Sequence, residues 1–211
     1  MPGSAPESDS SSAADSGDDG MSLADHFLIA MPAMLDPVFG GAVVYLCEHN
    51  ANGALGVIIN KPTDMSVAVL LDRIDLQLEI APDNLDKVAM LNKSPVMFGG
   101  PVQSDRGFVL HAPYGDFSST MPVTDDIALT TSKDILEAVA AGQVPQRMLV
   151  TLGCAGWGAG QLEDEITRNG WLTVRADAGI MFDLPLEQRF AAALGLLGID
   201  PAMLSVEAGH A

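Results

Sequence analysis

One segment of the chain reads Met148-Leu149-Val150-Thr151-Leu152-Gly153-Cys154-Ala155-Gly156-Trp157-Gly158-Ala159-Gly160-Gln161, an apolar run followed by four glycines in eight residues. The apolar run predicts a β-strand, and the residues from Gln161 onward predict a helix after a glycine-rich turn. Free backbone N–H groups at such a junction can bind an anion. Alternatively, the glycines let the turn pass close to a neighbouring strand while Trp157 fills the core. The turn holds no Lys or Arg, which favours the packing interpretation.

Other short apolar runs, separated by Gly and Pro, predict further strands. These are Phe27–Ala30, Ala42–Cys47, Leu55–Asn60, Val96–Phe98, Phe108–His111, Ile127–Thr130, Trp171–Val174 and Ile180–Phe182. Apolar residues at helical spacing predict helices over Ser66–Ile74, Lys133–Ala141, Gln161–Asn169 and Leu186–Leu197. Because the strands come in clusters rather than in strict alternation with helices, we expect an α+β fold with three or four helices in a single domain.

The composition permits a packed core and argues against nucleic acid as a direct partner. Of the 211 residues, 48% are hydrophobic and 18% are charged, which excludes global disorder. The 28 acidic residues outnumber the 10 Lys and Arg, giving a net charge of −18 and a pI of about 4.2. So few cations leave little from which to build a phosphate-binding face.

The first part of the chain differs in kind from the rest. Residues 1–20 hold six serines, five acids and no base, so we expect a disordered tail before a single domain over residues 21–211. Without those five acids, 23 acids still face 10 bases, a net charge of −13. The start lacks the basic and apolar regions of a secretory signal, and no apolar run is long enough to span a membrane. We therefore expect a cytoplasmic protein with no membrane partner.

The sequence contains no recognisable catalytic, cofactor or metal motif. A Walker A loop and a dinucleotide-binding G-x-G-x-x-G are absent. The four histidines lie far apart and form no H-E-x-x-H pattern. Cys47 and His49 share one face of a predicted strand, but two ligands do not make a zinc site. We accordingly expect no cofactor and no metal, and we assign no catalytic residue.

Cys154 lies before a helix N-terminus, which can lower the pKa of a thiol. The spacing is not the G-x-[SC]-x-G of a nucleophile elbow, and the acids at positions 163–165 oppose the helix dipole. A buried, inert Cys154 is therefore favoured over a nucleophile or a redox sensor. Lys61 follows a predicted strand and lies either beside a site or in solvent. The residues retained as a candidate functional cluster are His49, Asn60, Lys61, His111, Cys154, Trp157 and Gln161.

Several ordered motifs recur in one known family. They are Phe27-Leu28-Ile29-Ala30-Met31-Pro32, Asp36, Phe39, Val44-Tyr45-Leu46-Cys47-Glu48-His49-Asn50, Gly53-Ala54-Leu55-Gly56-Val57-Ile58-Ile59-Asn60-Lys61-Pro62, Gly99-Gly100-Pro101-Val102, Gly107-Phe108-Val109-Leu110-His111, Gly156-Trp157-Gly158-Ala159-Gly160-Gln161-Leu162-Glu163-Asp164-Glu165, Asn169, Trp171 and Leu197-Gly198-Ile199-Asp200. In this respect the chain resembles the bacterial YqgE/AlgH family over residues 26–204. The resemblance implies an α+β fold of coiled, bifurcated mixed sheets and no agreed enzymatic activity. It also brings the label of a transcriptional regulator of alginate synthesis, which one member gave to the family.

Three functional hypotheses follow. The first is a cytoplasmic, non-enzymatic regulatory or interaction protein that acts through a protein partner or a small ligand and does not contact DNA. The second is an unrecognised enzyme or ligand-binding protein with a site around Gly153–Gln161, joined by His49, Asn60 and His111. The third is a thiol-based redox sensor using Cys154. Convergence of the polar residues in one concave pocket would favour the second.

Overall fold

The structure is a computed structural model that describes residues 22–200. The tail expected over residues 1–20 lies outside the described residues. The elements, in chain order, are β1 (His26–Ala30), β2 (Val43–Asn50), β3 (Gly53–Ile58), β4 (Pro62–Ser66), α1 (Val67–Arg73), α2 (Leu85–Lys93), β5 (Pro95–Phe98), β6 (Val102–Ala112), β7 (Thr120–Pro122), β8 (Ala128–Thr130), α3 (Asp134–Ala140), β9 (Arg147–Gly158), α4 (Gln161–Thr167), β10 (Trp171–Arg175), α5 (Ala178–Phe182) and α6 (Leu186–Gly195). No helix among residues 22–200 is long and apolar enough to cross a membrane.

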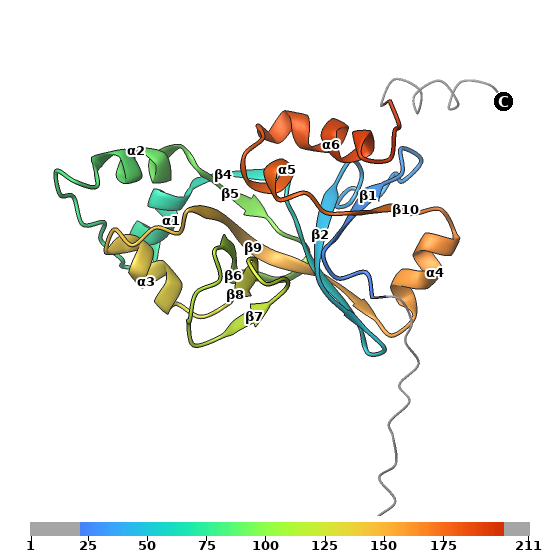
Figure 1. The fold of residues 1–211 in the computed structure, drawn as a ribbon, viewed down its shortest axis with the longest axis horizontal. Coiled ribbons are helices and arrows are strands. Elements are labelled where there is room, and N and C mark those ends of the chain that lie inside the picture. Colours follow the sequence, from blue (N-terminus) through green and yellow to red (C-terminus); the bar gives the residue numbers. More distant parts are fainter. Residues whose placement is uncertain (1–21, 201–211) are drawn as a thin grey trace, which may run out of the picture.

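The long strand β9 joins two branches of the sheet. The strand order is β10-β1-β2-β3-β9-β6-β8-β7, with β4 attached through β5, which also pairs with β9. The first part of β9 pairs antiparallel with β6 and parallel with β5, and its last residues pair antiparallel with β3. Figure 1 shows the two branches diverging from β9. The predicted α+β fold with a bifurcated mixed sheet is confirmed.

The expected glycine-rich turn is wrong, because the strand continues through Gly153 to Gly158. The glycines serve close packing. A Cβ atom on Gly153, whose φ is +75°, would collide with the carbonyl oxygen of Gly100. On the other side, a Cβ atom on Gly53 would collide with the carbonyl oxygen of Trp157. Without these side chains, β9 can lie directly against neighbouring backbone on both branches.

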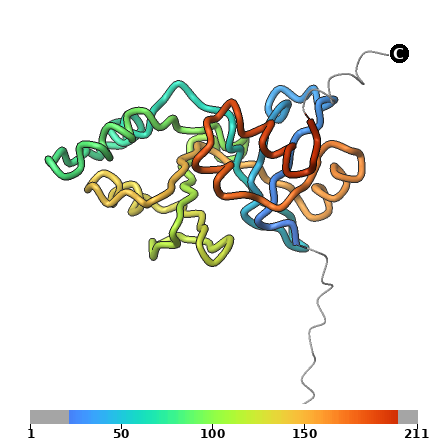
Figure 2. Tube along the Cα trace, turned by 45° about the horizontal axis from the view of Figure 1, so that its top comes forward, coloured from blue at the N-terminus to red at the C-terminus, as the bar shows by residue number. Residues whose placement is uncertain are grey.

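Both faces of β1 and β2 are buried, which explains their nearly continuous apolar sequences. Ile29 and Tyr45 face one core cluster, covered by α5 and α6, whereas Leu28 and Val44 face another, which also includes Trp157. The alternation follows from the two-residue period of a strand. A third cluster packs α1 and α3 against β5, β6 and β9. Figures 1 and 2 place α1–α3 at one end of the molecule and α4 at the other.

The described residues hold six helices rather than three or four. The expected strand Ile180–Phe182 is wrong, because this segment belongs to α5. The Asp177 carboxylate accepts a hydrogen bond from the Ile180 backbone N–H at 3.1 Å and so caps a helix there. The second unexpected helix, α2, buries only Leu91, so its apolar periodicity in the sequence is weak.

Candidate functional site

A cavity of about 330 Å³ opens beside α4. Helix α4 lies at the end of the molecule away from α1–α3 (Figure 1). The walls of the cavity come from β9, α4, β10, the loop of residues 31–42 and the segment between β5 and β6. The lining residues are Met34, Asp36, Phe39, Pro101, Gly156, Trp157, Gln161, Glu165, Arg168, Gly170 and Trp171. We call this cavity the aromatic pocket. Its volume is at the low end of the roughly 300–1,000 Å³ typical of small-molecule sites.

The Glu165 carboxylate organises the polar groups of the aromatic pocket. Its Oε2 accepts hydrogen bonds from the indole N–H groups of Trp157, at 2.9 Å, and Trp171, at 2.8 Å. Its Oε1 accepts one from the Gln161 side-chain amide at 2.9 Å. The amide oxygen of Gln161 in turn accepts from the backbone N–H of Gly158 at 3.0 Å. One carboxylate on α4 thus ties together β9 and β10.

Three aromatic rings contact one another in the pocket wall. The centroids of Trp157 and Trp171 are 6.1 Å apart, with the rings at 79°. Phe39 lies 5.5 Å from Trp171 at 78° and 6.2 Å from Trp157 at 33°. Edge-to-face geometry at these separations is favourable. The pocket therefore has a rigid aromatic wall.

Two candidate residues, Asn60 and Lys61, hold the loop that carries Phe39. The Asn60 side chain accepts a hydrogen bond from the Val43 N–H and donates one to the Gly41 carbonyl. The Lys61 ammonium donates to the Val38 carbonyl at 2.6 Å. Lys61 is therefore neither a solvated turn residue nor a lining residue of the pocket, and both side chains position the loop.

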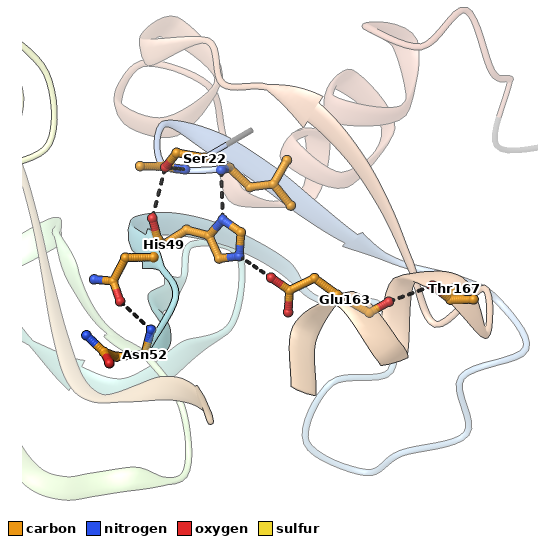
Figure 3. A network of polar contacts seen from close by, with 8 residues as sticks. Ser22, His49, Asn52, Glu163 and Thr167 are labelled. Atoms are coloured by element: carbon orange, nitrogen blue, oxygen red, sulfur yellow. Dashed lines mark hydrogen bonds and ion pairs between the residues drawn. The ribbon is translucent and has the colours of Figure 1, made fainter. Parts of the chain in front are cut away.

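A third candidate, His49, lies outside the pocket and forms a hydrogen bond with Glu163 of α4. Figure 3 shows its ring between the N-terminal segment and Glu163. Its Nδ1 accepts a hydrogen bond from the Leu23 N–H at 3.0 Å, so Nε2 carries the proton shared with Glu163 at 2.8 Å. The backbone N–H of Glu163 and the His49 side chain hold the pKa of that carboxyl below its ordinary range. The Ser22 hydroxyl donates to the backbone carbonyl of His49, not to the ring. With both ring nitrogens occupied, His49 has no free lone pair to act as a general base.

The remaining polar candidates, His111 and Cys154, lie in the core rather than at the aromatic pocket. His111 is fully buried. Its Nδ1 donates to the Pro113 carbonyl at 3.1 Å, and its Nε2 accepts from the Thr130 hydroxyl at 2.8 Å. Cys154 is 2% exposed and Cys47 is 3% exposed, and both are free thiols. Within residues 22–200, no three His, Cys, Asp or Glu side chains are placed to hold a metal ion.

Buried His111 makes the stability of the protein sensitive to mild acid. Burial lowers the pKa of its imidazole below the ordinary value of 6.5. The unfolded chain then binds a proton more readily, so this contribution to stability is present above about pH 6.5 and is lost as the pH falls below it. We expect the free energy of unfolding to decline between about pH 7 and pH 5. Urea denaturation at each pH measures it. In His111→Gln the decline over that interval should be smaller, and an unchanged slope would contradict the assignment.

The two thiols are expected to be unreactive. Burial raises the pKa of Cys47 and of Cys154, and the Arg106 guanidinium only partly opposes this at Cys154. Since the thiolate is the nucleophile, neither cysteine should be labelled unusually fast by iodoacetamide at neutral pH. Peptide mass spectrometry across a pH series tests this, with the urea-unfolded protein as the control. An apparent pKa of Cys154 well below about 8.5 would instead support the redox sensor.

The structure thus brings Trp157 and Gln161 together in one pocket and places Asn60, Lys61 and His49 behind its walls. His111 and Cys154 lie in the core and are not among the residues that line the aromatic pocket. The pocket residues that the sequence reasoning missed as candidates are chiefly Glu165, Trp171, Phe39 and Asp36. One available signal was that the chain has two tryptophans, and they flank the segment that forms α4.

Comparison with known proteins identifies the family to which this chain belongs. The pattern of the AlgH-like family, DUF179, matches residues 27–202. The chain therefore belongs to the AlgH-like family, and the resemblance noted in the sequence is confirmed.

Particular relatives support the same conclusion. A UPF0301 protein of Ralstonia nicotianae is 61% identical over 191 residues, which cover 90% of this chain and 96% of that protein. The solution structure of the AlgH protein from Pseudomonas aeruginosa superposes with a TM-score of 0.72 at 44% identity, covering 92% of this chain and 99% of the other. A crystal structure from Corynebacterium diphtheriae shares the fold, with a TM-score of 0.53 at 16% identity over 74% of this chain and 76% of that one.

Proposed function

We propose that this protein is a cytoplasmic, non-enzymatic regulatory protein that recognises a small ligand in the aromatic pocket. The observation that carries the proposal is the pocket itself: three rings and a carboxylate that accepts three hydrogen bonds line one cavity. Small-molecule sites are typically concave and mostly apolar, with a few placed polar groups. The regulatory role is the one that the family label suggests.

A binding role fits the pocket better than a catalytic one. Acid–base chemistry needs a titratable group that can exchange a proton with the substrate. In the aromatic pocket, Glu165 already accepts three hydrogen bonds, and Asp36 accepts two from backbone N–H groups of its own loop. His49 is engaged at both ring nitrogens outside the pocket, and His111 is in the core. The enzyme hypothesis required these histidines and the Gly153–Gln161 segment to converge.

The two tryptophans make the proposal directly testable, because both line the aromatic pocket and the chain has no others. A ligand that enters should change the intrinsic fluorescence in a saturable way. Candidate ligands come from native mass spectrometry of protein purified gently from its own cell type. We expect at least one co-purified small molecule to give such a titration.

Two matched glycine variants test whether the titration reports on the aromatic pocket, one inside the pocket and one outside it as the control. Gly156 lines the pocket, and a Cβ atom there would meet only Val102, at 3.7 Å, so Gly156→Val should narrow the pocket while the protein still folds. Gly107 lies in β6 outside the pocket, and a Cβ atom there would meet nothing within 4 Å. Gly156→Val should abolish the titration and Gly107→Val should retain it. Equal titrations in both variants would contradict a site in this pocket.

Any regulatory action should proceed without direct DNA contact. The net charge of −18 repels the phosphate backbone, and the 10 Lys and Arg residues are too few for a strong counterion-release contribution. We expect no binding to duplex DNA at physiological salt in a fluorescence anisotropy titration. Micromolar binding that weakens steeply with salt would contradict this part of the proposal.

A further inference from the structure

We infer that the aromatic pocket takes a small organic cation, with a quaternary or alkylated ammonium group against the rings of Trp157, Trp171 and Phe39. This inference rests on the proposed ligand-binding function and names the chemical class of the ligand. Three properties of the pocket carry it: the polar groups already in use, the arrangement of the rings and the sign of the charge at the rim.

The polar groups in the pocket wall leave few hydrogen bonds for a ligand. Both indole N–H groups and the side-chain amide of Gln161 donate to Glu165, and the Gln161 oxygen accepts from Gly158. An anionic ligand would need donors that are already engaged, and it would approach the Glu165 carboxylate. The tryptophans therefore offer the cavity their ring carbons rather than their N–H groups.

Aromatic rings attract cations through their negative faces, and tryptophan does so most strongly. The rings of Phe39 and Trp157 stand at 78° and 79° to that of Trp171. A compact cation can contact two walls set nearly at right angles, which is how quaternary ammonium groups are held in aromatic cages. Hydrogen bonding of both indoles to a carboxylate adds electron density to their rings and strengthens this attraction.

The charges around the pocket favour the same class. Asp36 and Glu165 contribute carboxylates, whereas Arg168 is the one cationic side chain among the lining residues. The Arg168 side chain is 81% exposed, so water screens it strongly. The net charge of −18 further attracts cations to the molecule. A volume of about 330 Å³ restricts the ligand to a small molecule or to one modified side chain.

The first test compares choline with 3,3-dimethylbutan-1-ol, a neutral molecule of the same shape in which carbon replaces the quaternary nitrogen. Intrinsic tryptophan fluorescence and calorimetry give the two dissociation constants. We expect choline to bind at least about tenfold more tightly, as attraction to partly desolvated rings would give. An alkylated ammonium group occurs both in free metabolites and on modified lysine side chains of proteins. A short peptide with trimethyllysine distinguishes these two sources. Tighter binding of the peptide indicates a modified protein, and tighter binding of choline indicates a free metabolite.

Two charge variants on the rim give effects of opposite sign. Asp36→Asn removes a charge but keeps the Oδ1 acceptor for the backbone N–H groups of Val38 and Phe39. It should weaken choline binding about two- to fivefold, the size expected for a solvent-screened charge. Arg168→Gln should strengthen choline binding by a similar factor. Asp125→Asn removes the same charge from the exposed loop between β7 and β8, outside the pocket, and should have little effect.

The outcomes separate this inference from the function on which it rests. If the neutral alcohol binds as tightly as choline, or if Asp36→Asn and Arg168→Gln do not act in opposite directions, the organic-cation inference is overturned while a ligand-binding pocket stands. Absence of choline and peptide binding at millimolar concentration also overturns it. The proposed function fails separately, when no co-purified molecule titrates the tryptophans.

Discussion

Replacing Trp157 by alanine is expected to lower the free energy of unfolding by about 3–5 kcal/mol, the usual range for a large buried aromatic residue. Its side chain is 6% exposed and packs against Phe39 and Trp171. The substitution also removes one of the two indole N–H groups that satisfy the Glu165 carboxylate. Lost apolar contact and a lost hydrogen bond to a charged group act in the same direction.

Urea denaturation followed by far-ultraviolet circular dichroism measures this loss, because the substitution itself changes the fluorescence. Trp157→Phe is the matched comparison: it keeps a six-membered aromatic ring and loses the five-membered ring of the indole with its N–H, so it should cost clearly less than alanine. If Trp157→Ala cost under about 1 kcal/mol, the ring would be acting as a mobile ligand-facing group rather than as part of the packed wall.

Gly100→Ala is expected to be at least as damaging, with a loss of about 3 kcal/mol or more. Gly100 has a φ of +148°, which L side chains rarely adopt. Its Cβ atom would also collide with the backbone of Cys154 and Ala155 in β9. Backbone cannot move aside as a flexible side chain can, so the strain and the overpacking both add to the cost.

Gly107→Ala is the control for Gly100→Ala. Gly107 lies in β6, and a Cβ atom there would meet no atom within 4 Å. Alanine at such a position leaves stability unchanged or slightly raised, because it restricts the unfolded chain. Thermal unfolding of the two variants side by side decides the matter. Similar melting temperatures would mean that the segment at Gly100 does not need to approach β9 closely.

The sequence predicted most strands correctly because burial on both faces leaves a strong apolar signal, as in Phe27–Ala30. The sequence-based prediction is wrong for two segments, each for a different physical reason. Ile180–Phe182 is apolar like a strand, yet the Asp177 cap starts a helix there. The segment 153–158 has the glycines of a turn, yet they permit close strand packing. Close approach between strands distant in sequence depends on the partner strand, which single-sequence patterns do not reveal.

The pocket was only partly predictable for a related reason. Trp157 and Gln161 were identified because they lie beside the glycines, within a few residues of each other. Phe39 reaches them only through the loop held by Asn60 and Lys61. In the sequence Glu165 is one of three consecutive acids at positions 163–165 of a predicted helix, with nothing to mark it, whereas in the fold it is the common acceptor of two indoles. Convergence of this kind depends on tertiary structure.

Because β9 belongs to both branches of the sheet, its hydrogen bonds should break only when the whole protein unfolds. Neither branch can detach while this strand remains paired, so its central amides should exchange with solvent only on global unfolding. The same strand supplies Trp157 to the aromatic pocket. An occupied pocket should therefore slow exchange of every amide that exchanges only on global unfolding, including those in the distant β6, by the factor set by ligand concentration over its dissociation constant.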